Sequence, residues 1–269
     1  MSENFIHSSY SKNQFPKLFT ILSDIHGTHR QFILPKTNYL LLCGDFTIRG
    51  YGIKDFIQWI ENQQVDVLIS VLGNHEKKQQ IKTLEKIKGK IKEVHALDGN
   101  YLHINEFQFI GSGYKFNIHK KEINKINPKY PLICLSHEPP FNMMDYGIRM
   151  RQLINGEFFH AGSKVVQQFI QKVQPDLHCF GHCHSSHGIC KVGKTTFVNG
   201  SIVDDNNSLC FKPLQLKYYN KKFIPLTQSK CITLNQFIQQ INQKPSKFIY
   251  DNREYKEEKI QLIKDSIVN

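Results

Sequence analysis

Three apolar runs near the start of the chain are each followed by polar residues that can bind a metal or a substrate. The runs cover residues 18–22, 39–43 and 65–72, and amphipathic helical patterns follow the second and the third. This alternation predicts a parallel sheet covered by helices. The polar residues after the runs include Asp24, His26, Asp45, Asn74 and His75. Because open α/β sheets bind ligands at the carboxyl ends of their strands, we expect these side chains to share one crevice.

The second half of the chain adds strands and more histidines. Residues 132–135 are a predicted strand that leads into His137, and residues 177–180 are one that leads into His182 and His184. Three predicted hairpins cover residues 101–110, 188–200 and 214–226. Ligand-type residues therefore recur in five short motifs along the chain, four of them at predicted strand ends.

Between Glu138 and Gly162 the periodic pattern breaks. The segment contains two adjacent prolines, two methionines, Arg149 and Arg151, and it predicts a long loop. A loop of this length in a compact domain is usually a lid or a substrate-binding loop. Ser163 directly after it is a predicted N-cap of a helix.

The chain divides into three parts that differ in composition and periodicity. Residues 1–17 are a polar segment, residues 18–230 contain all the predicted strands, and residues 231–269 show helical periodicity without a cluster of ligand-type residues. We therefore expect one α/β domain followed by a helical extension that packs on the core or on a partner.

Hydropathy and cysteine usage predict a soluble cytoplasmic protein with no membrane segment. No apolar run reaches the roughly 18 residues that a membrane helix needs, and the first residues lack the apolar core of a signal peptide. The seven cysteines are an odd number and are scattered through predicted strands, as reduced thiols are. Cys179 and Cys183 flank Gly181-His182, but their spacing does not fit a zinc finger.

The chain carries a net charge of +12. A basic surface attracts phosphate-bearing partners, so nucleic acid is a possible partner. The lysines are spread along the chain, however, and no aromatic stacking platform or base-reading motif accompanies them. Solvated lysine faces explain the excess equally well. The oligomeric state is not predicted.

Carboxylate, amide and imidazole side chains without a thiolate favour Mn²⁺, Fe or Zn²⁺ over Ca²⁺. Two such cations about 3.5–4 Å apart would neutralise a phosphoryl group, lower the pKa of a water molecule and clamp the attacking and leaving oxygens. A pair of metals needs one carboxylate that bridges them, and Asp45 is the predicted bridge. The residues thus predict a phosphoesterase with two divalent metal ions as cofactors.

Whole phrases of the sequence resemble the calcineurin-like metallophosphoesterase superfamily over roughly residues 18–218. They include LSDIHGTHRQF, CGDFTIRG, VLGNHE, SHEPP, QPDLHCFGHCH and FVNGS. The phrases are most similar to the small branch that contains the vertebrate brain-expressed metallophosphoesterase-domain proteins. The resemblance implies a four-layer α/β/β/α sandwich of two mixed sheets, here with the helical extension at its C-terminus.

The resemblance also assigns roles. It implies that one metal is held by Asp24, His26, Asp45 and His184. It implies that the other is held by Asp45, Asn74, His137 and His182. His75 would be the general acid over the leaving group, and the branch implies phosphodiesterase activity with cyclic nucleotides as one substrate class.

Two departures concern the substrate. Protein phosphatases of the superfamily orient the catalytic histidine with an aspartate where this chain has Ile48, which argues against a phosphoprotein substrate. The stretch Gly111-Ser-Gly113-Tyr114 has glycine where relatives often carry proline, and the 138–162 loop differs from the family pattern. We expect such positions to shape the substrate pocket.

Three further residues are candidates for contact with a small phosphodiester substrate: Arg49, which could clamp a phosphate, and the loop residues His29 and His187. Two alternatives remain open at this point. The same fold could hydrolyse a phosphomonoester or a nucleic acid end, or it could be a non-catalytic scaffold that binds another protein.

Overall fold

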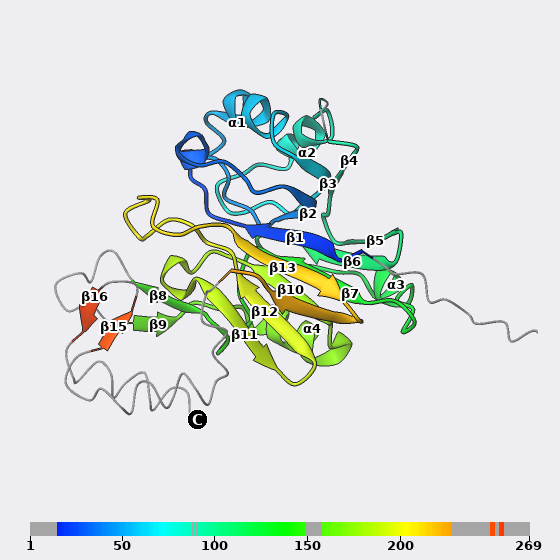
Figure 1. The fold of residues 1–269 in the computed structure, drawn as a ribbon. Helices are drawn as coiled ribbons and strands as arrows, with labels where there is room; N and C mark the ends of the chain where they lie inside the picture. Colours follow the sequence, from blue (N-terminus) through cyan, green and yellow to red (C-terminus); the bar gives the residue numbers. More distant parts are fainter. Residues whose placement is uncertain are drawn as a thin grey trace, which may run out of the picture.

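The structure is a computed structural model that describes residues 15–87, 89, 91–148, 158–227, 248–250 and 253–255. Two six-stranded mixed sheets form the centre of the described structure (Figure 1). The first sheet has the order β14-β13-β1-β2-β3-β4, and β1 to β4 are parallel. Its strands are β1 (Lys17–Leu22), β2 (Thr37–Leu42), β3 (Val65–Ser70), β4 (Glu93–Ala96), β13 (Leu214–Tyr219) and β14 (Lys222–Pro225).

The second sheet has the order β11-β12-β10-β7-β6-β5. Its four central strands are parallel, and antiparallel strands close it at both edges. Its strands are β5 (Asn100–Ile104), β6 (Phe107–Ser112), β7 (Leu132–Ser136), β10 (Leu177–Phe180), β11 (Gly188–Val192) and β12 (Thr195–Asn199). The three predicted hairpins are therefore confirmed as β5–β6, β11–β12 and β13–β14.

Successive side chains of a strand pack in different core clusters, and this alternation explains the layered architecture. In β2, Tyr39 and Leu41 belong to the core cluster that both sheets share, whereas Leu40 and Leu42 pack in the cluster with the helices α1 (Ile53–Ile60) and α2 (Gln79–Leu84). Successive residues of a strand point to opposite faces, so an all-apolar strand must be covered on both sides.

The second sheet is built the same way. The helix α4 (Lys164–Val173) packs on its outer face through Val166, Phe169 and Ile170, and α3 (Lys120–Ile123) lies beside β5. Figure 1 shows α1 and α2 on one side of the molecule and α4 on the other, with the sheets between them. The predicted four-layer sandwich of two mixed sheets is confirmed. Ser163 is also confirmed as a cap, because its Oγ accepts a hydrogen bond from the Val166 amide.

The loop predicted between Glu138 and Gly162 is wrong in part. Its described residues contain two short antiparallel strands, β8 (Tyr146–Ile148) and β9 (Phe158–His160). The buried Asp145 carboxylate organises this segment by accepting hydrogen bonds from the amides of Asn142 and Gly162 and from His160 Nδ1. Arg149 and Arg151 lie outside the described residues.

The C-terminal part is described only in six residues. These form β15 (Phe248–Tyr250) and β16 (Arg253–Tyr255), which pair antiparallel, so the predicted helix is wrong at these positions. Each of these strands has only three residues, which is too few for the alternation typical of a strand to stand out in a segment with helical periodicity. The rest of the predicted helical extension lies outside the described residues, and the division into 1–17, 18–230 and 231–269 stays a prediction.

None of the described helices is long and apolar enough to cross a membrane. Within the same residues no disulfide joins the buried cysteines Cys43, Cys134, Cys179 and Cys183. Burial raises the pKa of the Cys134 and Cys179 thiols above the ordinary value, so these two side chains act as small apolar core residues.

One buried histidine makes stability depend on pH. Burial among Ser136, Phe180 and Phe197 lowers the pKa of His178 to about 3. Below the ordinary histidine pKa of about 6.5 the unfolded chain binds a proton that the folded chain does not, so stability falls as pH falls from about 6.5 toward 3. Between pH 6.5 and 5 this contributes a loss of about 2 kcal/mol.

We therefore expect a His178→Leu variant to lose less unfolding free energy over this interval than the wild-type protein, by about that amount. Urea unfolding at pH 6.5 and pH 5 measures the difference, and other titrating groups cancel in the comparison. Equal losses for both proteins would contradict the prediction.

Candidate metal centre

Loops from both sheets meet at the carboxyl ends of the parallel strands. Asp24 and His26 follow β1, and the Asp24 and His26 amides donate hydrogen bonds of 3.0 Å to the carbonyl oxygens of Gly44 and Asp45 after β2. In the second sheet the loops that follow β7 and β10 are tied by the Gly181 amide, which donates to the His137 carbonyl. The polar residues predicted to share one crevice are thus brought together.

Two glycines permit this close approach. A Cβ atom on Gly73 would overlap the Asp45 carboxylate, and one on Gly181 would overlap the Ser23 hydroxyl and the Asp24 carboxylate. Only glycine leaves room for a neighbouring loop at such positions. The glycines before Asn74 and His182 are therefore part of the site.

Four of the candidate ligands also have a left-handed backbone. The φ angles are 51° at Asp24, 44° at His26, 50° at Asp45 and 66° at His182. Residues other than glycine rarely adopt this conformation, and each such residue costs on the order of 1–3 kcal/mol. Strain of this kind clusters at functional sites, where the surrounding structure holds a side chain in a working position.

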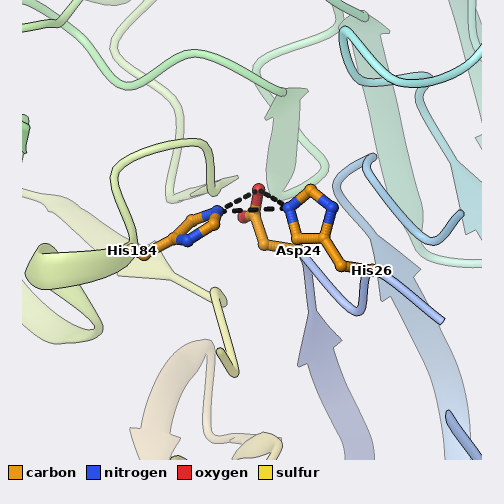
Figure 2. A group of neighbouring side chains, drawn as sticks. All are labelled: Asp24, His26 and His184. Carbon is orange, nitrogen blue, oxygen red and sulfur yellow. Dashed lines mark hydrogen bonds and ion pairs between the residues drawn. The ribbon is translucent and has the colours of Figure 1, made fainter. Parts of the chain in front are cut away.

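Asp24, His26 and His184 form the first ligand group (Figure 2). Asp24 Oδ1 lies 3.3 Å from His184 Nε2 and 3.9 Å from His26 Nε2, and the two Nε2 atoms are 3.3 Å apart. The other oxygen, Oδ2, accepts hydrogen bonds from the Ser201 hydroxyl and the His182 amide. Oδ1 is buried and has no hydrogen-bond partner among the described residues.

This arrangement fits a cation. His184 Nδ1 donates to the Asp204 carbonyl, so a neutral ring presents the lone pair of Nε2 to Asp24. Burial lowers the pKa of His26 to about 4 against the opposing charges of Asp24 and Asp45, so His26 is neutral at pH 7. A neutral imidazole is the form that binds metals.

The second ligand group is built around His137. Its Nδ1 donates to the Cys43 carbonyl at 2.8 Å, which leaves a lone pair on Nε2 of the neutral ring. That Nε2 lies 2.9 Å from Asn74 Oδ1, 3.5 Å from Asp45 Oδ2 and 3.2 Å from His182 Nδ1. When the His137 ring is neutral, its Nε2, Asn74 Oδ1 and Asp45 Oδ2 are all acceptors that face one another, and a cation at that place would bind all three.

Asp45 connects the two groups. Its Oδ1 accepts a hydrogen bond from the His75 amide, whereas Oδ2 faces His26 Nε2 at 3.8 Å and His137 Nε2 at 3.5 Å. One carboxylate oxygen therefore faces an imidazole from each group. The residues present fit two divalent cations, and the role of Asp45 as their shared ligand stays a prediction.

His75 lies at the edge of the centre with its side chain 27% exposed. The Arg49 amide donates to His75 Nδ1 at 3.3 Å, so Nε2 carries the proton of the neutral ring, and Nε2 is 3.9 Å from Asp45 Oδ2. The ring meets that of His26 edge-on at 4.6 Å. The backbone amide of Arg49 thus supplies an orienting contact beside Ile48, where protein phosphatases of the superfamily carry an aspartate.

Glu76 is the last residue of the phrase VLGNHE, and the sequence alone assigns it no role. Its carboxylate accepts hydrogen bonds from the amides of Asp45, Gly73 and Thr47 and from the Thr47 hydroxyl. Burial and the nearby Asp45 charge raise its pKa. Glu76 therefore ties the loop after β2 to the loop after β3. The sequence signal for this role was the presence of a charged residue directly after His75.

The three predicted substrate residues are placed differently. His29 is buried, contacts Asp55 at 2.7 Å and packs on Phe56 and Trp59, contacts that join it to α1. These contacts give His29 a packing role, and its contact with a substrate stays a prediction without support from this geometry.

His187 also has packing contacts: its Nδ1 donates to the Ser201 carbonyl, and its ring stacks on Phe211. Burial lowers its pKa to about 4, so the ring is neutral at pH 7. Its contact with a substrate stays a prediction without support from this geometry. Arg49 is exposed beside His75, so its guanidinium remains a candidate for a phosphate contact.

The sequence profile of the calcineurin-like phosphoesterases matches residues 6–186. The chain belongs to this family. Human metallophosphoesterase domain-containing protein 1 is 24% identical over 223 residues, which cover 70% of this chain and 67% of the human protein. An uncharacterised protein of Methanocaldococcus jannaschii is 27% identical over 198 residues, which cover 67% of this chain and 86% of that protein.

A solved structure shares the fold. It superposes with a TM-score of 0.57 at 15% identity and covers 78% of this chain and 98% of the matched chain. The family and the His/Asp groups together support metal-dependent hydrolysis of a phosphoester.

Proposed function

We propose that this chain hydrolyses phosphodiesters with two divalent metal ions and with His75 as the general acid. One observation carries the proposal: Asp45 Oδ2 lies within 3.9 Å of His26, His75 and His137. A single carboxylate oxygen thus joins both ligand groups to the proposed acid. Because His75 Nε2 lies 3.9 Å from Asp45 Oδ2, its proton would lie beside a phosphoryl group bound at the metals.

The metals would supply charge neutralisation and an acidified water molecule. The chain's own residues supply the rest. Asp24, His26 and His184 would hold one metal, and Asn74, His137 and His182 would hold the other, with Asp45 as a candidate ligand of both. His75 Nε2–H would lie beside the leaving oxygen, and in its imidazolium form the ring would give this proton to that oxygen and become neutral. The Arg49 amide positions the ring in its neutral form, in which Nδ1 accepts the hydrogen bond.

A phosphodiester is the proposed substrate class because the site lacks the aspartate that orients the histidine in protein phosphatases. Ile48 is 44% exposed at that position, and the Arg49 amide takes over part of the orienting role. Cyclic nucleotides are one proposed group of substrates, following the similarity to the metallophosphoesterase domain-containing proteins.

We also propose that the metals are Mn, Fe or Zn and that the protein is cytoplasmic. The donor atoms are imidazole nitrogens, carboxylate oxygens and one amide oxygen, which suit these metals better than Ca²⁺. The buried thiols support a reducing compartment.

Paired aryl esters test the substrate class. With Mn²⁺, Fe²⁺ or Zn²⁺ added, we expect kcat/KM for bis(p-nitrophenyl) phosphate to exceed that for p-nitrophenyl phosphate. The same panel extends to 2′,3′- and 3′,5′-cyclic nucleotides and to short nucleic acids. A tenfold or larger preference for the monoester would overturn the diesterase proposal and favour a phosphomonoesterase, whereas cleavage of nucleic acid alone would favour a nuclease.

A further inference from the structure

Tyr114 lies against the second ligand group. Its ring centroid is 5.9 Å from that of His182 and 6.3 Å from that of His137, and the side chain is 43% exposed. An exposed aromatic ring beside two candidate metal ligands is available to a molecule bound at the metals. The uncharged tyrosine ring suits stacking on another planar group rather than ion pairing.

The backbone holds this ring in place. The Tyr114 amide donates a hydrogen bond of 2.9 Å to the Leu72 carbonyl, and the next amide, that of Lys115, donates to Glu138 Oε2 at 3.1 Å. A Cβ atom on Gly113 would overlap the Leu72 carbonyl, so the chain approaches the segment after β3 more closely than another residue allows. Tyr114 is thus fastened to the loops that carry Asn74 and His137.

A cavity of about 130 Å³ opens beside Tyr114. Asn74 lines it on the metal side, Leu97 gives it an apolar wall, and Lys78 and Asp98, 2.9 Å apart, lie at its polar edge. A cavity of about 150 Å³ holds benzene in another protein, so this space matches a single planar ring. The polar edge offers a donor and an acceptor to ring substituents.

The positions of Tyr114 and His75 indicate which part of a bound substrate would contact Tyr114. His75 contacts His26 in the first ligand group, whereas Tyr114 contacts His137 and His182 in the second. The leaving group must lie beside the proposed acid, His75. The ester group that stays on phosphorus is then the one beside Tyr114.

From this geometry we infer that Tyr114 and the adjoining cavity form a subsite for a planar ring, such as a nucleobase or an aryl group, on the retained ester group of the substrate. The inference rests on the proposed phosphodiesterase function. Tyr114 is a specificity-determining residue in this account, because it binds the ring and takes no part in the transfer of the phosphoryl group.

Two diesters with one leaving group test the subsite. In phenyl p-nitrophenyl phosphate and methyl p-nitrophenyl phosphate, water attacks phosphorus and p-nitrophenolate leaves from both, while the retained group differs. We expect Tyr114→Ala to lower kcat/KM for the phenyl ester at least about tenfold, mainly by raising KM. We expect less than about a threefold change for the methyl ester. Tyr114→Phe should keep the preference for the phenyl ester.

Equal losses on both esters would overturn the inference, because Tyr114 would then only support the histidines. No loss on either ester would also overturn it. Tyr219→Ala is the matched control, since Tyr219 is 44% exposed at the end of β13, and we expect it to leave both rates unchanged.

A binding measurement separates failure of this inference from failure of the proposed function. By calorimetry on the metal-loaded protein, we expect phenylphosphonate to bind at least about tenfold more tightly than methylphosphonate, and Tyr114→Ala to reduce that ratio to within about twofold. This comparison needs no hydrolysis. Equal affinities in the wild-type protein, or an unchanged ratio in the variant, would overturn the subsite even if diesters are hydrolysed.

Discussion

Replacing His75 by alanine is expected to lower kcat/KM for an aryl diester by about 10²–10⁴-fold, the usual contribution of a positioned acid or base. The substitution removes Nε2, whose proton faces the space beside Asp45. It keeps the backbone amide that donates to Asp45 Oδ1, so the proposed bridging carboxylate keeps its position. Because His75 is not a proposed ligand, the content of two metals per chain should stay the same.

Steady-state rates and metal analysis of the same preparation measure both effects. His95→Ala is the matched control: His95 is a similarly exposed histidine on β4 that pairs with Glu93, and its loss should change neither rate nor metal content. A His75→Ala variant with the wild-type rate would exclude the general-acid role. A variant that is also fully functional in cells would favour the non-catalytic scaffold.

The sequence predicted the parts of the fold that depend on local pattern. The strands β1 and β2 carry apolar residues on both faces and α1 has one apolar stripe, so these elements could be placed from residue spacing alone. The positions of Asp24 and Asp45 after these strands then placed the centre, because the carboxyl ends of parallel strands share one edge.

Other features depend on contacts that spacing does not carry. The pairing of β8 with β9 depends on a buried Asp145 that accepts bonds from residues on both sides of it. The role of Glu76 comes from three backbone amides and a hydroxyl, and that of His29 from a carboxylate on α1. A sequence shows the side chains but not the amides that meet them.

The orientation of His75 is a further case of this kind. The substitution of aspartate by Ile48 removed the expected side-chain partner, which the sequence could show. The replacement by the Arg49 amide depends on the left-handed backbone of Arg49, with φ at 52°. This backbone conformation brings the Arg49 amide to His75 Nδ1, and no residue pattern in the sequence predicts it.

Asp45→Asn is the second substitution with a large expected effect, because it keeps the shape of the side chain and removes its charge. The amide oxygen can still accept from the His75 amide, but the new NH₂ group replaces the oxygen that faces His26 and His137. An NH₂ group cannot bind a cation. We therefore expect metal content to fall from two ions per chain to one or fewer, and kcat/KM to fall at least about 10³-fold, since the metals supply several kcal/mol of transition-state stabilisation.

The same variant separates binding from catalysis. Ligands that bind only the folded chain raise its melting temperature, so added Mn²⁺ or Zn²⁺ should stabilise the wild-type protein more than Asp45→Asn. Asp66→Asn is the control, because Asp66 pairs with Lys92 on the surface, away from the centre, and should keep both the metal-induced shift and the rate. Two ions bound with unchanged affinity in Asp45→Asn would mean that this carboxylate does not join the two ligand groups, and the centre would then be two separate sites rather than one.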